Sequence, residues 1–158
     1  MITFREFILL ENYFNISKKL KITNPLFHAT GLAAIKIVDK KEGLKTGQGS
    51  NFGSGNANGI SMTRDFSVVS RGKFGHTILV CSRDELKTKF KIEQVNYFGD
   101  RSEKEERIIT NHIPVKFIKA MIILTSPIAN GKEFAKWNPD VKYFWWNDSD
   151  LIQLPIEK

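Results

Sequence analysis

With 158 residues, 41% of them apolar and 26% charged, the chain fits one soluble globular domain. It has no run of about 18 apolar residues, which excludes a membrane span. Arg5 and Glu6 interrupt its apolar N-terminus, which excludes a secretory signal, and Cys81 is its only cysteine, which excludes an internal disulfide. We therefore expect a cytoplasmic protein. The net charge of +7 suits a polyanionic partner such as nucleic acid, but dispersed lysines that merely keep the protein soluble explain it equally well.

The first third of the chain is predicted to run helix, strand, helix and loop. Apolar residues recur at near-helical spacing over residues 3–20, which predicts a helix. PLFHAT, residues 25–30, follows as a short strand, and residues 32–43 have the pattern of a second helix that Gly43 ends. Residues 46–58 are rich in Gly, Ser and Asn and nearly empty of apolar groups, which predicts a flexible loop or lid.

Short strands dominate the predicted remainder of the chain. They are expected at residues 59–63, 76–81, 105–109 and 119–124. A helical turn capped by Ser82 is predicted after the second of these strands. Residues 92–102 are predicted to form a loop, and residues 112–118 are predicted to form a connection between strands. The strand at 119–124 is expected to be the last. The aromatic tail should close one end of the core with Trp137, Tyr143, Phe144, Trp145 and Trp146. Irregular alternation of short strands with few helices predicts an α+β fold rather than a doubly wound parallel sheet.

Three short polar motifs stand out as candidates for chemistry, and the first surrounds His28. A histidine near a strand end, followed by Ala29 and Thr30, places a ring N–H and a hydroxyl beside accessible backbone. The small Ala29 side chain lets a flat ligand approach the main chain. The alternative is a structural histidine at a strand–turn junction.

The second motif is the strand that follows the glycine-rich loop. Ser61 and Thr63 alternate with apolar residues and so share one face of the strand. Arg64 is a forked, permanently charged donor that suits a pyrophosphate, although it could equally pair with Asp65. The glycine-rich loop lacks the spacing of a phosphate-binding fingerprint.

The third motif is the acidic run at residues 103–106, which leads into a predicted strand. A carboxylate fixed on a sheet can stabilise an oxocarbenium-like centre and accept a hydrogen bond from a sugar hydroxyl. Alternation places Glu106 on one face with Ile108, and Glu105 on the other face with Arg107. The alternative is a solvated charge patch.

In this order, the motifs resemble the His-type ADP-ribosyltransferases, which include the poly-ADP-ribose polymerases and the DarT-type enzymes that modify DNA bases. LFHAT is similar to their Leu-x-His-Gly-Thr/Ser strand, with Ala29 in place of the usual Gly. GISMTRD stands where the polymerases carry Gly-Ile-Tyr-Phe, so Ser61 replaces the tyrosine that stacks on nicotinamide. Phe66 or Phe52 could supply that stacking instead.

The acidic run resembles the catalytic segment of the DarT-type enzymes, in which an apolar–Pro pair lies eight residues after the glutamate. Ile113-Pro114 has that spacing from Glu106, which makes Glu106 the first candidate for the catalytic residue. The Arg-type branch instead uses a Glu-x-Glu pair, which Glu103-Lys104-Glu105 could imitate, so Glu105 is the second candidate. That branch also has a Ser-Thr-Ser strand, which residues 61–63 could imitate. The preceding loop resembles the acceptor-contacting segment, with candidates Tyr97, Phe98 and Asp100.

The resemblance covers residues 25–124 and implies a single-domain, split mixed β-sheet with NAD between its halves. It implies that His28 binds a ribose hydroxyl of NAD, that the Ala29 backbone holds the carboxamide, and that a glutamate stabilises the departure of nicotinamide. The implied function is NAD-dependent mono-ADP-ribosyl transfer that needs no metal. The favoured acceptor is nucleic acid, and protein is the second choice. Compact proteins of this kind are familiar from phage and prophage regions. Two rivals stay open: a non-catalytic binding module on this fold and an RNA 2′-phosphotransferase-like enzyme.

Overall fold

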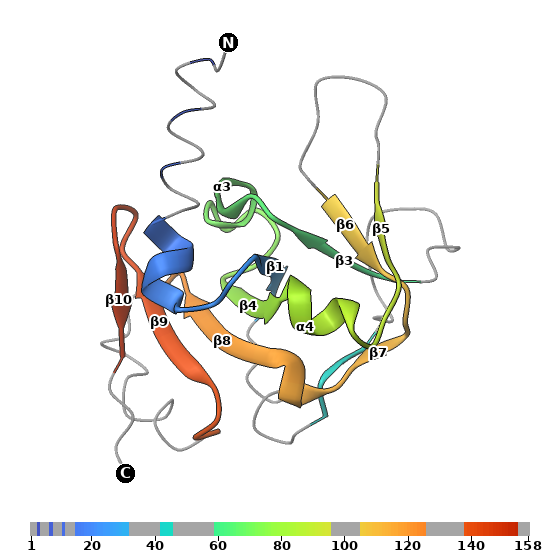
Figure 1. Ribbon diagram of the computed structural model, residues 1–158. Helices are drawn as coiled ribbons and strands as arrows, with labels where there is room; N and C mark the ends of the chain where they lie inside the picture. The colour runs from blue at the N-terminus through green and yellow to red at the C-terminus, as the bar shows by residue number, and fades with distance from the viewer. Residues whose placement is uncertain are drawn as a thin grey trace.

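The computed structural model describes residues 15–31, 42–45, 59–95, 105–125 and 138–154, together with Thr3, Phe7 and Glu11. An eight-stranded sheet runs through these residues in the order β10-β9-β8-β4-β1-β3-β6-β5 (Figure 1). Its strands are β1 (Pro25–Thr30), β3 (Ile60–Thr63), β4 (Thr77–Ser82), β5 (Ile92–Gln94), β6 (Glu105–Ile108), β8 (Ile118–Ile123), β9 (Lys142–Trp146) and β10 (Leu151–Gln153). Within this sheet only β8 and β9 pair in parallel, so the predicted α+β class with a mixed sheet is confirmed.

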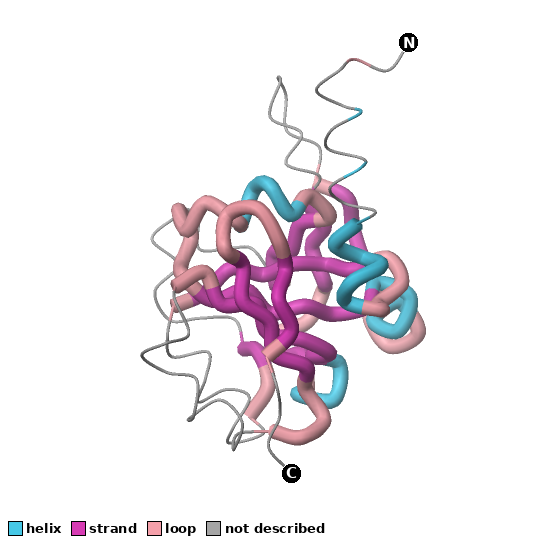
Figure 2. The backbone as a smooth tube through the Cα atoms, turned by 90° about the vertical axis from the view of Figure 1, so that its left-hand side faces the viewer, coloured by secondary structure: helices cyan, strands magenta, loops and turns pink. Residues whose placement is uncertain are grey.

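The remaining described elements are small. β2 (Leu44–Lys45) pairs with β7 (His112–Ile113) in a separate two-stranded sheet. The helical elements are α3 (Phe66–Val69), α4 (Arg83–Lys87), the 3₁₀ turn η1 (Val115–Phe117) and the helical residues 15–20. Figure 2 shows strands through the middle of the molecule and helical segments outside them. No helix among the described residues is long and apolar enough to cross a membrane.

The central strands bury both faces of the sheet, because their side chains alternate between two hydrophobic clusters. In β1, Leu26 belongs to the first cluster and Phe27 to the second. Leu86 of α4 packs on the first cluster, whereas the helical residues 15–20 and α3 pack on the second through Leu20 and Phe66. All six residues of β4 are buried, as expected for a strand covered on both sides.

Most of the predicted strands are confirmed. The segments predicted at 25–30, 59–63, 76–81, 105–109 and 119–124 correspond to β1, β3, β4, β6 and β8. Ser82 is the N-cap of α4, with its Oγ accepting a hydrogen bond from the Glu85 amide at 3.5 Å. Of the predicted helix at 32–43, only the end is described, and Gly43 there has φ +72°, a left-handed conformation that favours glycine. The predicted loop at 46–58 lies outside the described residues.

Three predictions about the second half of the chain are wrong. Residues 92–94 are not loop but β5, which pairs with β6 at the edge of the sheet. The predicted connection at 112–118 contains β7 and η1 as well as the first residue of β8. β8 is not the last strand, because the aromatic tail continues the sheet as β9 and β10 and buries Tyr143 and Phe144. These short strands lack regular apolar alternation, so pairing with a neighbouring strand decides their conformation.

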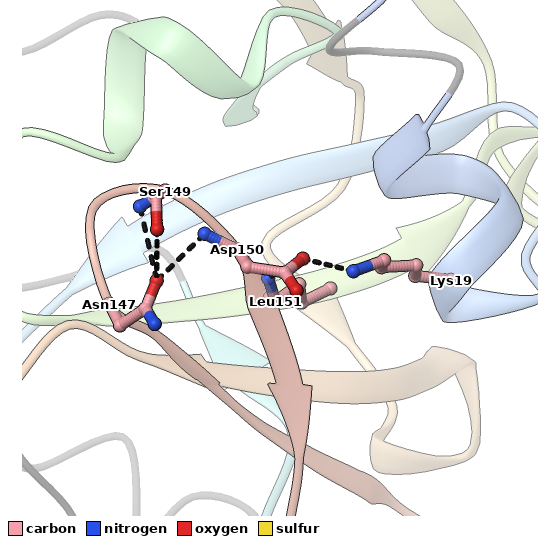
Figure 3. Close-up of polar contacts among 5 residues, drawn as sticks. All are labelled: Lys19, Asn147, Ser149, Asp150 and Leu151. Carbon is pink, nitrogen blue, oxygen red and sulfur yellow. Dashed lines mark hydrogen bonds and ion pairs between the residues drawn. The ribbon is translucent and has the colours of Figure 1, made fainter.

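The turn between β9 and β10 is held by side-chain hydrogen bonds (Figure 3). Asn147 Oδ1 accepts from the Ser149 amide and hydroxyl and from the Asp150 amide. Asp150 in turn forms an ion pair with Lys19 of the N-terminal helical segment, which links that segment to the end of the sheet. Hydrogen bonding to Lys19 and to the Leu151 amide lowers the pKa of Asp150. Both partners are exposed, so this ion pair adds little stability.

Candidate active site

The pairing between two central strands of the sheet is reduced to one register pair. β1 pairs with β4 over all six of its residues, whereas β1 and β3 share only the register pair Phe27–Thr63. From Phe27 towards Thr30 the two strands therefore diverge, and this part of β1 has no register partner in β3. The strands β10-β9-β8-β4-β1 and β3-β6-β5 lie on either side of this reduced pairing within the one sheet.

His28 spans this divergence. Its ring Nδ1 lies 2.8 Å from the Ser61 carbonyl oxygen of β3, where a regular ladder would supply a backbone amide. Because a carbonyl only accepts, Nδ1 carries the proton, and Nε2 of the neutral ring is an acceptor. Burial lowers the pKa of His28 below its ordinary value of 6.5, and the hydrogen bond to Ser61 opposes this only in part. The imidazole is therefore neutral at neutral pH, with Nε2 available to accept a hydrogen bond from a hydroxyl.

Ser61 also connects β3 to a carboxylate of β6. Its hydroxyl donates to Glu105 Oε1, and Arg107 Nη2 lies 4.0 Å from the same oxygen. Ser61 is exposed, and the Glu105 side chain keeps 11% of its surface accessible. Ser61 thus contacts His28 through its backbone carbonyl and Glu105 through its hydroxyl, and so links three strands that are far apart in sequence.

Glu106 lies in a different environment from Glu105. Its register partners are Met62 in β3 and Gln94 in β5, and Met62 belongs to the first hydrophobic cluster. The Glu106 side chain has no exposed surface. Its Oε2 accepts a hydrogen bond from Arg83 Nε at 2.7 Å, and its Oε1 lies 3.4 Å from Arg64 Nε. The two adjacent glutamates therefore occupy opposite faces of the sheet, as alternation predicts.

The other predicted cofactor-binding residues separate into two groups. Ala29 and Thr30 are half-buried at the diverging end of β1, with Ala29 packed on the second cluster. Thr63 is buried and its hydroxyl accepts from the Asp65 amide, so it shapes the turn into α3. Asp65 does not pair with Arg64 but caps α3 by accepting from the Ser67 amide at 2.9 Å.

Phe66 is a core residue in this structure. It is 5% exposed, and its ring makes edge contacts with Phe27 at 5.3 Å and with Trp146 at 5.0 Å between centroids. A ring buried in the core in this way cannot stack on a ligand without leaving the core. The alternative stacking residue Phe52 and the predicted acceptor-binding residues lie outside the described residues; the latter are Tyr97, Phe98 and Asp100.

Sequence reasoning missed Arg83 as a functional candidate. It begins α4 directly after the capping Ser82, where it has the pattern of an ordinary surface residue. The signal that could have identified it was Glu106, because a carboxylate in a buried strand requires a cation close by. Which arginine supplies that cation depends on the packing of α4 against the sheet, which the sequence does not specify.

The other ionisable groups of the described residues do not extend this site. His112 Nε2 is hydrogen-bonded to the Glu42 carbonyl at 2.6 Å, as a structural histidine would be. Cys81 is buried in the first cluster, and burial raises the pKa of its thiol to about 12. Within the described ranges no group of three or more His, Cys, Asp or Glu side chains is arranged to hold a metal ion. No family model, curated protein or solved structure matches the chain.

Proposed function

We propose that this protein is an NAD-dependent mono-ADP-ribosyltransferase whose reaction takes place where β1 and β3 diverge. The observation that carries the proposal is that Ser61 contacts His28 through its carbonyl and Glu105 through its hydroxyl. These contacts link all three motifs of the His-type resemblance where β1 and β3 share one register pair. The resemblance implies NAD between two halves of the sheet, and the reduced pairing here supports that expectation.

His28 supplies a hydrogen-bond acceptor at a fixed position. With Nδ1 donating to Ser61, the neutral ring directs its acceptor Nε2 away from that carbonyl, because the two nitrogens lie on different sides of the ring. A ribose hydroxyl of NAD can donate to Nε2. The backbone of Ala29 and Thr30 beyond the last register pair with β3 is the candidate partner of the carboxamide.

We assign the catalytic role to Glu105, although the sequence favoured Glu106. A catalytic carboxylate must reach the ribose, and Glu106 is fully buried with two arginines close to its oxygens. Glu105 is partly accessible, and the Ser61 hydroxyl holds one of its oxygens while the other is left for the substrate. A carboxylate held in this way stabilises positive charge on the ribose as the bond to nicotinamide breaks.

The transfer is completed by a nucleophilic group of the acceptor. It attacks the anomeric carbon, nicotinamide leaves with the electrons of the broken glycosidic bond, and the acceptor loses a proton. The net charge of +7 favours a polyanionic acceptor, so nucleic acid is the first choice and protein the second.

The test is transfer of label from NAD to separate pools of DNA, RNA and protein by the wild type and by Glu105→Gln. The substitution keeps the size and the hydrogen bond from Ser61 but removes the negative charge. We expect label on one class of acceptor, and a loss of about a hundredfold or more in the variant, by analogy with other preorganised charge-stabilising groups. NAD binding, measured separately by calorimetry, should change much less than turnover.

Glu85→Gln is the matched control, because Glu85 is an exposed glutamate whose carboxylate pairs with Lys119 on the surface. It should transfer label at the wild-type rate. If Glu105→Gln keeps full activity while Glu106→Gln, folded by circular dichroism, loses it, then Glu106 is the reacting carboxylate and our assignment is wrong. Binding of NAD without transfer to any of the three pools would favour the non-catalytic rival.

A further inference from the structure

Arg64 and Arg83 converge on one buried carboxylate. Arg64 follows β3, Arg83 begins α4, and both direct Nε toward Glu106 of β6. Glu106 is fully buried, whereas the arginine side chains keep 37% and 28% of their surface exposed. Three separate elements therefore bring two guanidinium groups to one place at the surface, above a common internal anchor.

This cluster is not balanced in charge or in hydrogen bonds. Two guanidinium groups and one carboxylate leave one net positive charge. Arg64 Nε and Glu106 Oε1 are buried and pair with each other at 3.4 Å, but neither makes a hydrogen bond among the described residues. A buried ion pair alone is rarely favourable, because the desolvation of both charges offsets their attraction. One carboxylate would suffice for one arginine, so the second arginine needs another explanation.

We propose that Arg64 and Arg83 form a binding site for a phosphate group, with Glu106 as its anchor. Among the described residues both arginines contact Glu106 through Nε, which leaves their terminal nitrogens for a ligand. A guanidinium fork matches two oxygens of a phosphate. The contacts with Glu106 fix both arginine side chains before the ligand binds, which lowers the entropy cost of binding. The phosphate neutralises the excess positive charge of the cluster.

Two sources of phosphate fit this chemistry. One is the pyrophosphate of a dinucleotide such as NAD, and the other is the phosphodiester backbone of a nucleic acid. The proposal rests on the proposed transferase function only for the identity of the ligand, because phosphate binding itself does not depend on catalysis. Glu105 lies on the opposite face of the sheet from Glu106, so the two functions can be removed by different substitutions.

The experiment measures the binding of inorganic pyrophosphate, NAD and a single-stranded oligonucleotide by calorimetry. Arg83→Gln and Arg64→Gln each remove one charge and one fork. We expect each to weaken pyrophosphate binding at least tenfold, which corresponds to one charge-assisted hydrogen bond of about 1.5–3 kcal/mol. A parallel loss with NAD identifies the dinucleotide as the source, and a parallel loss with the oligonucleotide identifies the nucleic-acid backbone.

Arg71→Gln is the matched control, because Arg71 is exposed and its substitution changes the net charge by the same amount. It should bind pyrophosphate as the wild type does, and so should Glu105→Gln, even though the latter loses transfer. Arg83→Lys keeps the charge that Glu106 requires but not the fork, so it tests binding in a protein that still folds. Wild-type pyrophosphate affinity in all three variants at Arg64 and Arg83, or no binding of any of the three probes by the wild type, would overturn the proposal.

Discussion

At the scale of single residues, His28 makes the same backbone carbonyl contact that a strand neighbour would make. Its Nδ1–H takes the place of a β1 amide opposite the Ser61 carbonyl. The imidazole is desolvated in doing so, and burial lowers the pKa of His28. The protonated form would be a charge in an apolar setting and would leave Nε2 without its acceptor character. The stability of the fold and the proposed hydrogen bond from a ribose hydroxyl therefore both require the neutral ring.

The pKa of His28 predicts a loss of stability in mild acid. The unfolded chain binds a proton at the ordinary value of 6.5, but the folded chain binds it only at lower pH. Stability is therefore complete above about pH 6.5 and falls as the pH drops below it, by at most about 1.4 kcal/mol per pH unit for one proton. Urea unfolding at about pH 7 and about pH 5 should show this loss in the wild type.

His28→Gln should show a smaller loss of stability between the same two pH values. The two other histidines are present in both proteins, so the difference reports on His28. An identical decrease in the free energy of unfolding in both proteins would mean that His28 titrates normally in the folded state.

At the scale of elements, the turn at residues 70–76 packs closely against the end of β1. A Cβ atom added to Gly75 would lie 2.2 Å from the Thr30 carbonyl oxygen, and Gly75 has φ +132°. Only glycine allows this approach at this backbone conformation. The turn therefore fixes the position of Thr30, two residues from His28, in the part of β1 that has no register partner in β3.

Gly75→Ala is expected to displace this turn and the end of β1. The clash is with backbone rather than with a flexible side chain, and the strained φ adds to it, so we expect a loss of about 2–3 kcal/mol in the free energy of unfolding. NAD binding should weaken as well, because His28 moves with the strand. Thermal unfolding and calorimetry measure the two effects.

Gly31→Ala is the control at the neighbouring position. A Cβ atom on Gly31 meets no atom within 4 Å, so this variant should keep the stability and the NAD affinity of the wild type. Equal behaviour of the two variants would show that the packing of residue 75 against Thr30 does not position the site.

At the scale of the whole molecule, the sheet has a centre that is buried on both faces and, among the described residues, two exposed edge strands. β4 and most of β8 are buried between the two hydrophobic clusters, whereas β5 and β10 end the sheet and expose most of their residues. Edge strands have one unpaired side and few apolar contacts, so they open at lower free energy than the centre.

Native-state hydrogen exchange should resolve this gradient of stability. We expect the amides of β4 and β8 to exchange only through global unfolding, and those of β5 and β10 to exchange by local opening. β1 should be protected on its β4 side throughout, because all six of its residues pair there. Protection of β5 equal to that of β4 would mean that the sheet opens only as one unit.

Hydrophobic pattern and local signals were sufficient to predict β1, β3, β4, β6 and β8, since each is a run of strand-forming residues between turns. The Ser82 cap was equally local. β5, β7, β9 and β10 were not predicted as strands, because they lack regular apolar alternation and their conformation depends on pairing with a neighbouring strand. The three polar motifs were also found in the sequence, together with the two alternating faces of Glu105 and Glu106.

What the sequence by itself determined is thus the set of central strands and the polar residues they carry, because both follow from spacing along the chain. Only the tertiary structure decided which residues meet: that Ser61 joins His28 to Glu105, and that Arg83 and Arg64 lie beside Glu106. The physical reason is that burial and ion pairing depend on which strands become neighbours and on where α4 packs. Contacts between residues far apart in the chain leave no periodic signal in it.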